Sequence, residues 1–262
     1  MLLLPTFSSS TAEHTNAAAA NRWRGGSAAL VLGTLLLIGS QVAGADNAPQ
    51  SSATKPAPKD AKWLSRHEGF VELAKQQEVG VLFLGDSITD FWRYAEGQEV
   101  WNHYFRPRKA ANFGIQSDRT ENVLWRVQHG ELEGINPKVV VLMIGTNNTG
   151  NNSAAEIADG VKAIVDEICH QKPETRVLLL GIFPRGPKPT DPVRQKIKET
   201  NEIIAKLDDG GQHVRYLDIG EKFLDADGNL PPKIMPDATH PNKGGYQIWA
   251  KAMEPTLTEL LK

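Results

Sequence analysis

Short apolar runs recur along the chain between residues 79 and 219, and polar or glycine positions bound them. Two of the runs, "KVVVLMIG" and "TRVLLLGI", are apolar almost throughout, which is typical of strands that are covered on both faces. We therefore predict five strands, over residues 79–85, 109–114, 138–145, 175–182 and 213–219.

Amphipathic segments with helix start signals lie between these runs. Asp118 with Glu121, and Ser153 with Glu156, have the spacing of a capping box at the start of a helix. Both signals predict helices that connect successive strands.

Two further helices are predicted nearer the C-terminus. Asp191-Pro192 places a proline at the first helical position, where no hydrogen bond is lost. The last segment, from residue 243, is also helical in pattern, but Pro255 should kink or interrupt it. Alternating strands and helices indicate an α/β fold with a parallel sheet covered on both faces. Sites in such sheets lie at the carboxyl ends of the strands.

The N-terminal region has the pattern of an export signal. Arg22 and Arg24 precede an apolar segment, residues 27–39, which has the length of a signal-peptide core and is short for a membrane span. An A-x-A cleavage pattern follows at residues 43–45. We expect residues 1–45 to direct export to the periplasm or the extracellular space. The alternative is an uncleaved segment that tethers the protein to a membrane.

The next stretch, "DNAPQSSATKPAPKD", is rich in Pro, Ala and Ser. Such a composition cannot bury enough apolar surface to order itself, so we expect residues 46–61 to form a disordered linker. The folded domain should then comprise residues 62–262.

Composition narrows the classes of function. The 262 residues carry a formal net charge of -2, and no basic stripe is present, so a nucleic-acid partner is not expected. Cys169 is the only cysteine, which excludes a disulfide within the chain and a cysteine-based zinc site. No cofactor motif or clustered metal ligands are found, so we expect neither a cofactor nor a metal.

Residues suited to chemistry follow three of the predicted strands. The first strand ends at Gly85 and is followed by Asp86 and Ser87. The second ends at Gly114, and the third runs into "GTNN", residues 145–148. Because the strands are predicted to be parallel, these residues should share one edge of the sheet.

A serine hydrolase needs a nucleophile, a base, a carboxylate that orients the base, and donors that bind the oxyanion. Ser87 can be the nucleophile and His240 the base, and Asp237, three residues earlier, can orient His240. The backbone amides of Ser87 and Gly114 and the side-chain amide of Asn147 can form the oxyanion hole.

Each of these residues alone has an ordinary structural interpretation. Ser87 can be a turn residue or helix cap, Asn147 a turn residue, and Asp237 with His240 a surface turn. Asp86 is better explained as a cap or brace of the turn than as a chemical group. Their occurrence together, at the right strand ends, favours a hydrolase.

Three segments, "FLGDSITDFW", "NFGIQSDRTENVLWRVQHGELEGINPKVVVLMIGTNN" and "DATHPNKGGYQIW", resemble the conserved blocks of the SGNH, or GDSL, hydrolase superfamily. The chain is most similar to the catalytic subunits of intracellular platelet-activating factor acetylhydrolases, over most of residues 62–262. The resemblance implies a flavodoxin-like three-layer α/β/α sandwich with a five-stranded parallel sheet. It also implies the catalytic and oxyanion roles named above, and it is compatible with a homodimer.

The resemblance further implies that Ile88, Thr146 and Thr239 line an acyl pocket, although ordinary packing beside a site explains them equally well. Two features differ from the intracellular members of the family, namely the export signal and Thr239 in place of a bulkier apolar residue. Both differences argue against platelet-activating factor itself as the substrate.

We therefore expect a serine esterase that hydrolyses short-chain esters, with acetyl as the expected acyl group, on an O-acetylated glycan or an acetylated lipid. Action on longer chains, as a lysophospholipase or thioesterase, is the alternative within the same class. The class of hydrolases with a G-x-S-x-G motif is excluded, because Thr89 stands at its last position.

Two alternatives from other classes remain. One is a non-catalytic module that binds glycans at a surface, but such modules usually lack a triad residue, and none is missing here. The other is a metal-dependent phosphoesterase that uses Asp86 and His240, for which the sequence shows no clustered ligand set.

Overall fold

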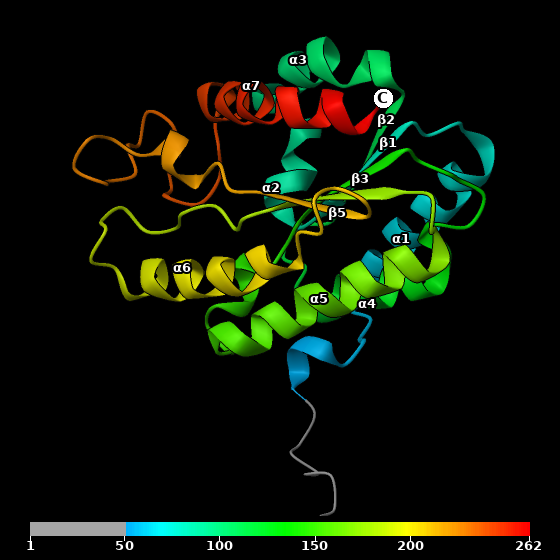
Figure 1. Cartoon of the computed structure of the whole chain (residues 1–262), viewed down its shortest axis with the longest axis horizontal. Helices are drawn as coiled ribbons and strands as arrows, with labels where there is room; N and C mark the ends of the chain where they lie inside the picture. Colours follow the sequence, from blue (N-terminus) through cyan, green and yellow to red (C-terminus); the bar gives the residue numbers. More distant parts are fainter. Residues whose placement is uncertain (1–50) are drawn as a thin grey trace, which may run out of the picture. The chain divides into compact units, whose positions relative to one another are not determined.

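The computed structural model of the protein describes residues 51–262. Five strands form one sheet in the order β2-β1-β3-β4-β5, and every neighbouring pair is parallel (Figure 1). The strands are β1 Val81–Gly85, β2 Ala110–Gly114, β3 Val139–Met143, β4 Arg176–Leu180 and β5 Val214–Leu217. All five predicted strands are present, each shorter than predicted, and the α/β fold is confirmed.

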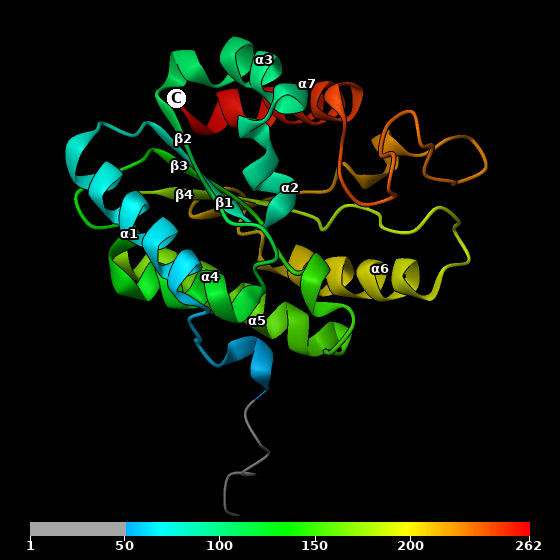
Figure 2. The same ribbon diagram turned by 180° about the vertical axis from the view of Figure 1, so that it is seen from behind.

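Helices cover both faces of the sheet and complete three layers (Figures 1 and 2). One face carries α3 (Ala95–Tyr104) and α7 (Lys243–Leu260). The opposite face carries α1 (Ala61–Gln76), α4 (Thr120–Arg126), α5 (Ala154–Gln171) and α6 (Pro192–Ile204). The strand order reverses at β1, which pairs with both β2 and β3, so the crevice typical of such folds lies at the carboxyl end of β1.

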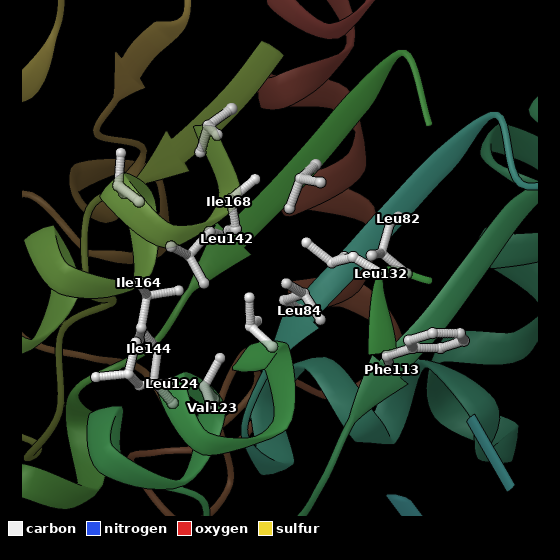
Figure 3. Packing of buried hydrophobic residues seen from close by; sticks show 14 of the residues in the cluster. Leu82, Leu84, Phe113, Val123, Leu124, Leu132, Leu142, Ile144, Ile164 and Ile168 are labelled. Atoms are coloured by element: carbon white, nitrogen blue, oxygen red, sulfur yellow. The ribbon is translucent and has the colours of Figure 1, made fainter. Parts of the chain in front are cut away.

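Two apolar cores hold these layers together. Successive side chains of a strand point to opposite faces, so Leu82 and Leu84 enter the core under α4 and α5, where they pack near Phe113 (Figure 3). Phe83 points the other way and meets Trp249 of α7. Full burial of one such side chain stabilises the fold by about 1.5–3 kcal/mol.

Two of the predicted helix starts are confirmed. The Ser153 hydroxyl accepts the Glu156 backbone N–H at 3.3 Å, and the Glu156 carboxylate accepts the Ser153 N–H at 2.8 Å, which is the reciprocal pair of a capping box. Pro192 is the first residue of α6. Local sequence signals were therefore sufficient where the first turn lies at the surface.

The prediction that Asp118 caps α4 is wrong, because the helix begins at Thr120. The Asp118 carboxylate is fully buried and accepts hydrogen bonds from Arg126 Nε at 2.9 Å and Trp63 Nε1 at 2.7 Å. These partners lie far from Asp118 in sequence or across a helix turn, and the local pattern gives no sign of them.

The expected interruption at Pro255 does not occur. α7 runs from Lys243 to Leu260 with Pro255 inside it. A proline removes the hydrogen bond of its own nitrogen, which weakens a helix locally. However, α7 buries Trp249 before the proline and Leu257 after it, and this packing keeps the two halves in one helix.

The expectation of a disordered linker is wrong for the part of residues 46–61 that the structure describes. Residues 52–54 form a 3-10 turn, and the Ala53 side chain is 0% exposed. The Ala53 carbonyl accepts a hydrogen bond from Thr120 Oγ1 at 2.8 Å, and the Ala57 carbonyl accepts one from Asn122 Nδ2 at 2.9 Å. The segment gains its order from α4 rather than from a core of its own.

The export signal expected over residues 1–45 lies outside the described residues and stays a prediction, which the mass of the mature chain would test. Within residues 51–262, no helix has both the length and the apolar character needed to cross a membrane.

Candidate active site

The turn after β1 presents Ser87 at the carboxyl end of the sheet. Ser87 is the first residue of the short helix α2 (Ser87–Asp90), and Asp86 caps this helix by accepting the Ile88 N–H at 2.9 Å. Because the first residues of a helix have no intrahelical acceptor, the Ser87 amide remains available to a ligand. The interpretation of Asp86 as the cap of this turn is therefore confirmed.

His240 reaches this turn from the other end of the chain. Its Nε2 lies 2.8 Å from Ser87 Oγ, although the two residues are 153 positions apart. His240 comes just before α7, so the packing of α7 on the sheet places the imidazole over the end of β1. The packing of α7 thus contributes to bringing nucleophile and base together, and backbone hydrogen bonds at Ala238 and Asn242 hold the loop between these two residues.

Asp237 completes a chain of hydrogen bonds. His240 Nδ1 lies 2.6 Å from Asp237 Oδ2, and Asp237 Oδ1 accepts the backbone N–H groups of Thr239 and His240 at 3.0 and 2.7 Å. Partial burial tends to raise the pKa of Asp237, but these hydrogen bonds and the charge of His240 outweigh it, so the pKa lies below its ordinary value. An ionised carboxylate can only accept, so His240 Nδ1 donates and Nε2 is free to take the serine proton.

Asn147 lies on the same rim, in the 3-10 turn Thr146–Asn148 that follows β3. Its Nδ2 donates a hydrogen bond to the Asp118 carbonyl at 2.9 Å. The side chain is half-buried, and the amide nitrogen carries a second hydrogen that this bond does not use. Asn147 can therefore donate to an oxyanion while its orientation is held by the loop after β2.

The structure contradicts the prediction that Gly114 supplies an oxyanion donor. Its N–H already donates to Asn112 Oδ1 at 2.9 Å. A Cβ at this position would lie only 2.3 Å from the Asp90 nitrogen, so the glycine permits close packing of β2 against α2. The sequence correctly indicated that something approaches Gly114 closely. The close neighbour is the helix α2, however, and not the substrate.

Ser117 is a candidate donor that sequence reasoning missed. Its φ of 62° lies in the left-handed region, which glycine favours, and its N–H has no acceptor within residues 51–262. It precedes Asp118, whose carbonyl accepts from Asn147 Nδ2, so Ser117 belongs to the loop that orients the Asn147 side chain. The sequence did not indicate a left-handed turn at this position, because a serine and not a glycine occupies it.

The three residues expected to line an acyl pocket differ in their exposure. Ile88 is 2% exposed and belongs to the apolar core, and its carbonyl accepts the Tyr246 hydroxyl at 2.9 Å. Thr146 is 1% exposed, whereas Thr239 is half-buried beside His240. Packing therefore accounts for Ile88 and Thr146, and Thr239 alone of the three keeps exposed surface.

A buried ionic network supports this rim. Arg126 binds Asp118 through Nε at 2.9 Å and Glu131 through Nη1 at 2.5 Å, and all three side chains are fully buried. Arg126 Nη1 also donates to the Phe113 carbonyl at 2.9 Å. His67 of α1 joins the network through Glu131 at 3.1 Å. The loop that carries Ser117 is thereby anchored to the end of β2 and to α1.

Within residues 51–262, no group of three or more His, Cys, Asp or Glu side chains could hold a metal ion. Asp86 and His240, the pair considered for a metal-dependent phosphoesterase, do not form such a group. The described part of the chain thus offers that alternative no ligand set.

The geometry can be compared with that of known proteins. The model of the GDSL-like lipase/acylhydrolase family matches residues 83–248, which include Ser87 and His240. The chain belongs to this family. It is a GDSL-type acylhydrolase, which is a carboxylic ester hydrolase.

Curated relatives agree with this family. The chain is 37% identical over 217 residues to the platelet-activating factor acetylhydrolase IB subunit alpha1 of Homo sapiens, which covers 81% of this chain and 92% of that protein. It is 39% identical over 203 residues to the alpha2 subunit of Rattus norvegicus, which covers 78% of this chain and 86% of the relative.

Solved structures share the fold. A GDSL-like lipase from Bacteroides thetaiotaomicron superimposes with a TM-score of 0.59 at 17% identity, over 76% of this chain and 96% of that one. The acetylxylan esterase Axe2 from Geobacillus stearothermophilus superimposes with a TM-score of 0.55 at 19% identity, over 70% and 94%. These likenesses confirm the α/β architecture with its five-stranded parallel sheet.

Proposed function

We propose that the protein hydrolyses short-chain carboxylic esters through an acyl-enzyme on Ser87. The observation that carries this proposal is the continuous hydrogen-bond chain from Ser87 Oγ through His240 to Asp237. His240 Nε2 takes the hydroxyl proton while Ser87 Oγ attacks the ester carbonyl, and Asp237 stabilises the resulting imidazolium. His240 then protonates the departing alcohol, and water releases the acyl group by the reverse steps.

The oxyanion of the tetrahedral intermediate needs donors in front of Ser87. We assign this role to the Ser87 amide, to Asn147 Nδ2 and to the Ser117 amide in place of Gly114. Asn147 and the loop after β2 are held together by the bond to the Asp118 carbonyl, so the donors are oriented before substrate arrives. Preorganised donors of this kind are among the largest contributions to catalysis in hydrolases.

Replacement of the nucleophile tests the proposal. Ser87→Ala should lower kcat on 4-nitrophenyl acetate by a factor on the order of a millionfold, because no other group forms the acyl-enzyme. Ser65→Ala, on the exposed side of α1, is the matched control and should keep full activity. Labelling by a fluorophosphonate should disappear in the first variant alone. A Ser87→Ala protein that retains most of the activity would disprove the mechanism.

We further propose that the acyl group is acetyl. The names of two similar proteins refer to acetyl esters. One is an acetylhydrolase at 37% identity, and the other is an acetylxylan esterase of the same fold. In this chain Ile88 and Thr146 are buried, at 2% and 1% exposure, so neither side chain offers an open apolar surface to a long acyl chain. An O-acetylated glycan or an acetylated lipid outside the cytoplasm would fit both this preference and the predicted export.

The chain length of the acyl group can be measured directly. The kcat/KM for 4-nitrophenyl acetate should exceed that for the octanoyl ester by about tenfold or more, since a chain that finds no apolar site gains no binding energy. A higher value for the octanoyl ester would instead favour the lysophospholipase or thioesterase alternative.

A further inference from the structure

A cavity of about 510 Å³ lies between α6 and the ends of β4 and β5. A second cavity includes Ser117, the candidate oxyanion donor, in its lining. This second cavity, of about 430 Å³, is lined by Ile115, Gln116 and Ser117 of the loop after β2. Its other walls come from the start of α1 and the turn after α2. Its volume is within the range of small-molecule sites.

The cavity borders the candidate active site on two sides. Ser117, our candidate oxyanion donor, is part of its wall. On the other side lies Tyr94, whose ring contacts Phe91 at 5.2 Å, and the Phe91 ring stacks on His240 at 4.9 Å. The cavity is therefore separated from the catalytic imidazole by two aromatic rings.

The cavity is basic in a protein that is slightly acidic overall. Its lining includes four cationic side chains and two acidic ones, namely Lys59, Lys62, Arg66, Arg93, Asp60 and Asp90. The whole chain has 29 Lys and Arg against 31 Asp and Glu, so this excess of positive charge is local. Lys62 and Arg66 are four residues apart in α1 and so share one face of the helix.

The two arginines are held in place by one buried carboxylate. Asp90 Oδ1 accepts from Arg66 Nη2 and from Arg93 Nε, both at 2.6 Å, and the Asp90 side chain is 2% exposed. Arg93 Nη2 also donates to the Tyr94 hydroxyl at 2.6 Å. One carboxylate between two guanidinium groups leaves a net positive charge, and the groups cannot move away from it.

Two observations show that a further anion would be favourable here. Burial lowers the pKa of Arg66 although the nearby Asp90 raises it, so the charged guanidinium is incompletely compensated. Its Nε is buried and has no hydrogen-bond partner in the described part of the chain. Lys62 is exposed and forms no ion pair within residues 51–262. An anionic ligand would improve the solvation of these groups.

We infer that this cavity binds an anionic group on the alcohol portion of the ester substrate. The assignment rests on the proposed function, because it requires His240 to be the group that protonates the departing alcohol. The departing alcohol must lie next to His240 to be protonated, and Phe91 and Tyr94 lead from there to the cationic side chains. The substrate class is therefore an acetyl ester of an alcohol that carries a carboxylate or a phosphate.

Matched pairs of esters test this inference. One pair is acetylglycerol and acetylglycerol phosphate, and the other is an acetylated methyl glucoside and the corresponding methyl glucuronide. The wild-type kcat/KM should be about threefold to tenfold higher for the anionic member of at least one pair, the range of one or two partly screened ion pairs. The pair that shows the preference identifies the source of the anion. Added salt should reduce the preference.

Charge reversal at Lys62 locates the effect. Lys62→Glu should lower kcat/KM about tenfold for the preferred anionic ester and change the neutral ester by less than twofold. Lys251→Glu makes the same change on an exposed position of α7, across the sheet from α1, and should alter neither. Because Lys62 bears no structural bond in the described residues, its replacement should leave the fold intact.

The outcomes separate the two proposals. Equal rates on both members of each pair, or an equal loss on both in Lys62→Glu, would overturn the anionic subsite. In either case hydrolysis of 4-nitrophenyl acetate and labelling of Ser87 would still support the esterase. Failure of the wild-type protein in both of these assays would overturn the esterase proposal itself.

Discussion

At the scale of single residues, Asp86 is a buried carboxyl group whose ionised form the fold does not stabilise. Its carboxyl group is fully buried next to Ser87, Oδ1 accepts the Ile88 N–H, and Oδ2 has no partner within the described residues. Burial raises the pKa of Asp86 to about 7, and the nearby Asp118 contributes in the same direction, while Arg185 opposes it. The turn that presents the nucleophile is thus built on a carboxyl group that prefers to be neutral.

This pKa predicts how stability depends on pH. The native state keeps the Asp86 proton up to about pH 7, whereas the unfolded chain loses it near 3.8, so unfolding releases a proton in this window. The free energy of unfolding should therefore fall as pH rises through the window, by about 1.4 kcal/mol per pH unit for one proton. Asp86→Asn keeps the Oδ1 acceptor and should lack this decrease.

Urea unfolding of both proteins from pH 4 to pH 8 measures the difference. The advantage of Asp86→Asn should grow with pH and level off above about pH 7. Asp227→Asn, at an exposed carboxylate, serves as the control and should follow the wild-type protein. A constant difference between Asp86→Asn and the wild type would contradict the buried, neutral state of Asp86.

At the scale of elements, two glycines inside helices have opposite surroundings. A Cβ on Gly160 of α5 would lie 2.6 Å from the Ala53 carbonyl oxygen and 2.6 Å from Thr120 Oγ1. A Cβ on Gly69 of α1 would meet nothing within 4 Å. Gly160 therefore lies where residues 52–54 pack against α5, and a side chain there would have no room. A side chain on Gly69 would meet no neighbouring atom.

The same substitution should have opposite effects at these two sites. Gly69→Ala should raise the free energy of unfolding by about 0.5–1 kcal/mol, as expected for a glycine in a helix interior. Gly160→Ala should lower it by about 1–3 kcal/mol, because the added methyl group collides with backbone. Thermal or urea unfolding measures both. Stabilisation by Gly160→Ala would mean that residues 52–54 do not pack on α5.

At the scale of the whole molecule, the site depends on the meeting of distant segments. Ser87 follows β1, Asn147 follows β3, and His240 precedes α7, and each occupies the carboxyl edge of the sheet. The parallel sheet supplies this edge, because its strands all end on the same side. Arg126 adds a second connection by joining the end of β2 to the loop that holds Ser117.

Much of this arrangement could be predicted from the sequence. Apolar runs mark strands that are buried on both faces, and glycine-bounded strand ends followed by Ser87 and Asn147 mark the functional edge. Helices α1 and α3 were not assigned. In α1 the polar residue His67 occupies a buried position, and α3 buries only Gly97 and Val100, so the apolar pattern of both is weak. The order of residues 51–60 was missed because it arises from hydrogen bonds to α4, not from their own composition.

The sequence by itself determined the fold class and the five strands, because these follow from periodicity. It also singled out Ser87, Asp237 and His240 as the candidate triad, from their residue types and their places relative to the predicted strands. Only the tertiary structure decided which amides can face an oxyanion. The Gly114 amide donates to Asn112 of its own strand, whereas the Ser117 amide, in a left-handed turn, has no acceptor within residues 51–262. Hydrogen-bond partners depend on which segments meet in space, and no local pattern of residues records that.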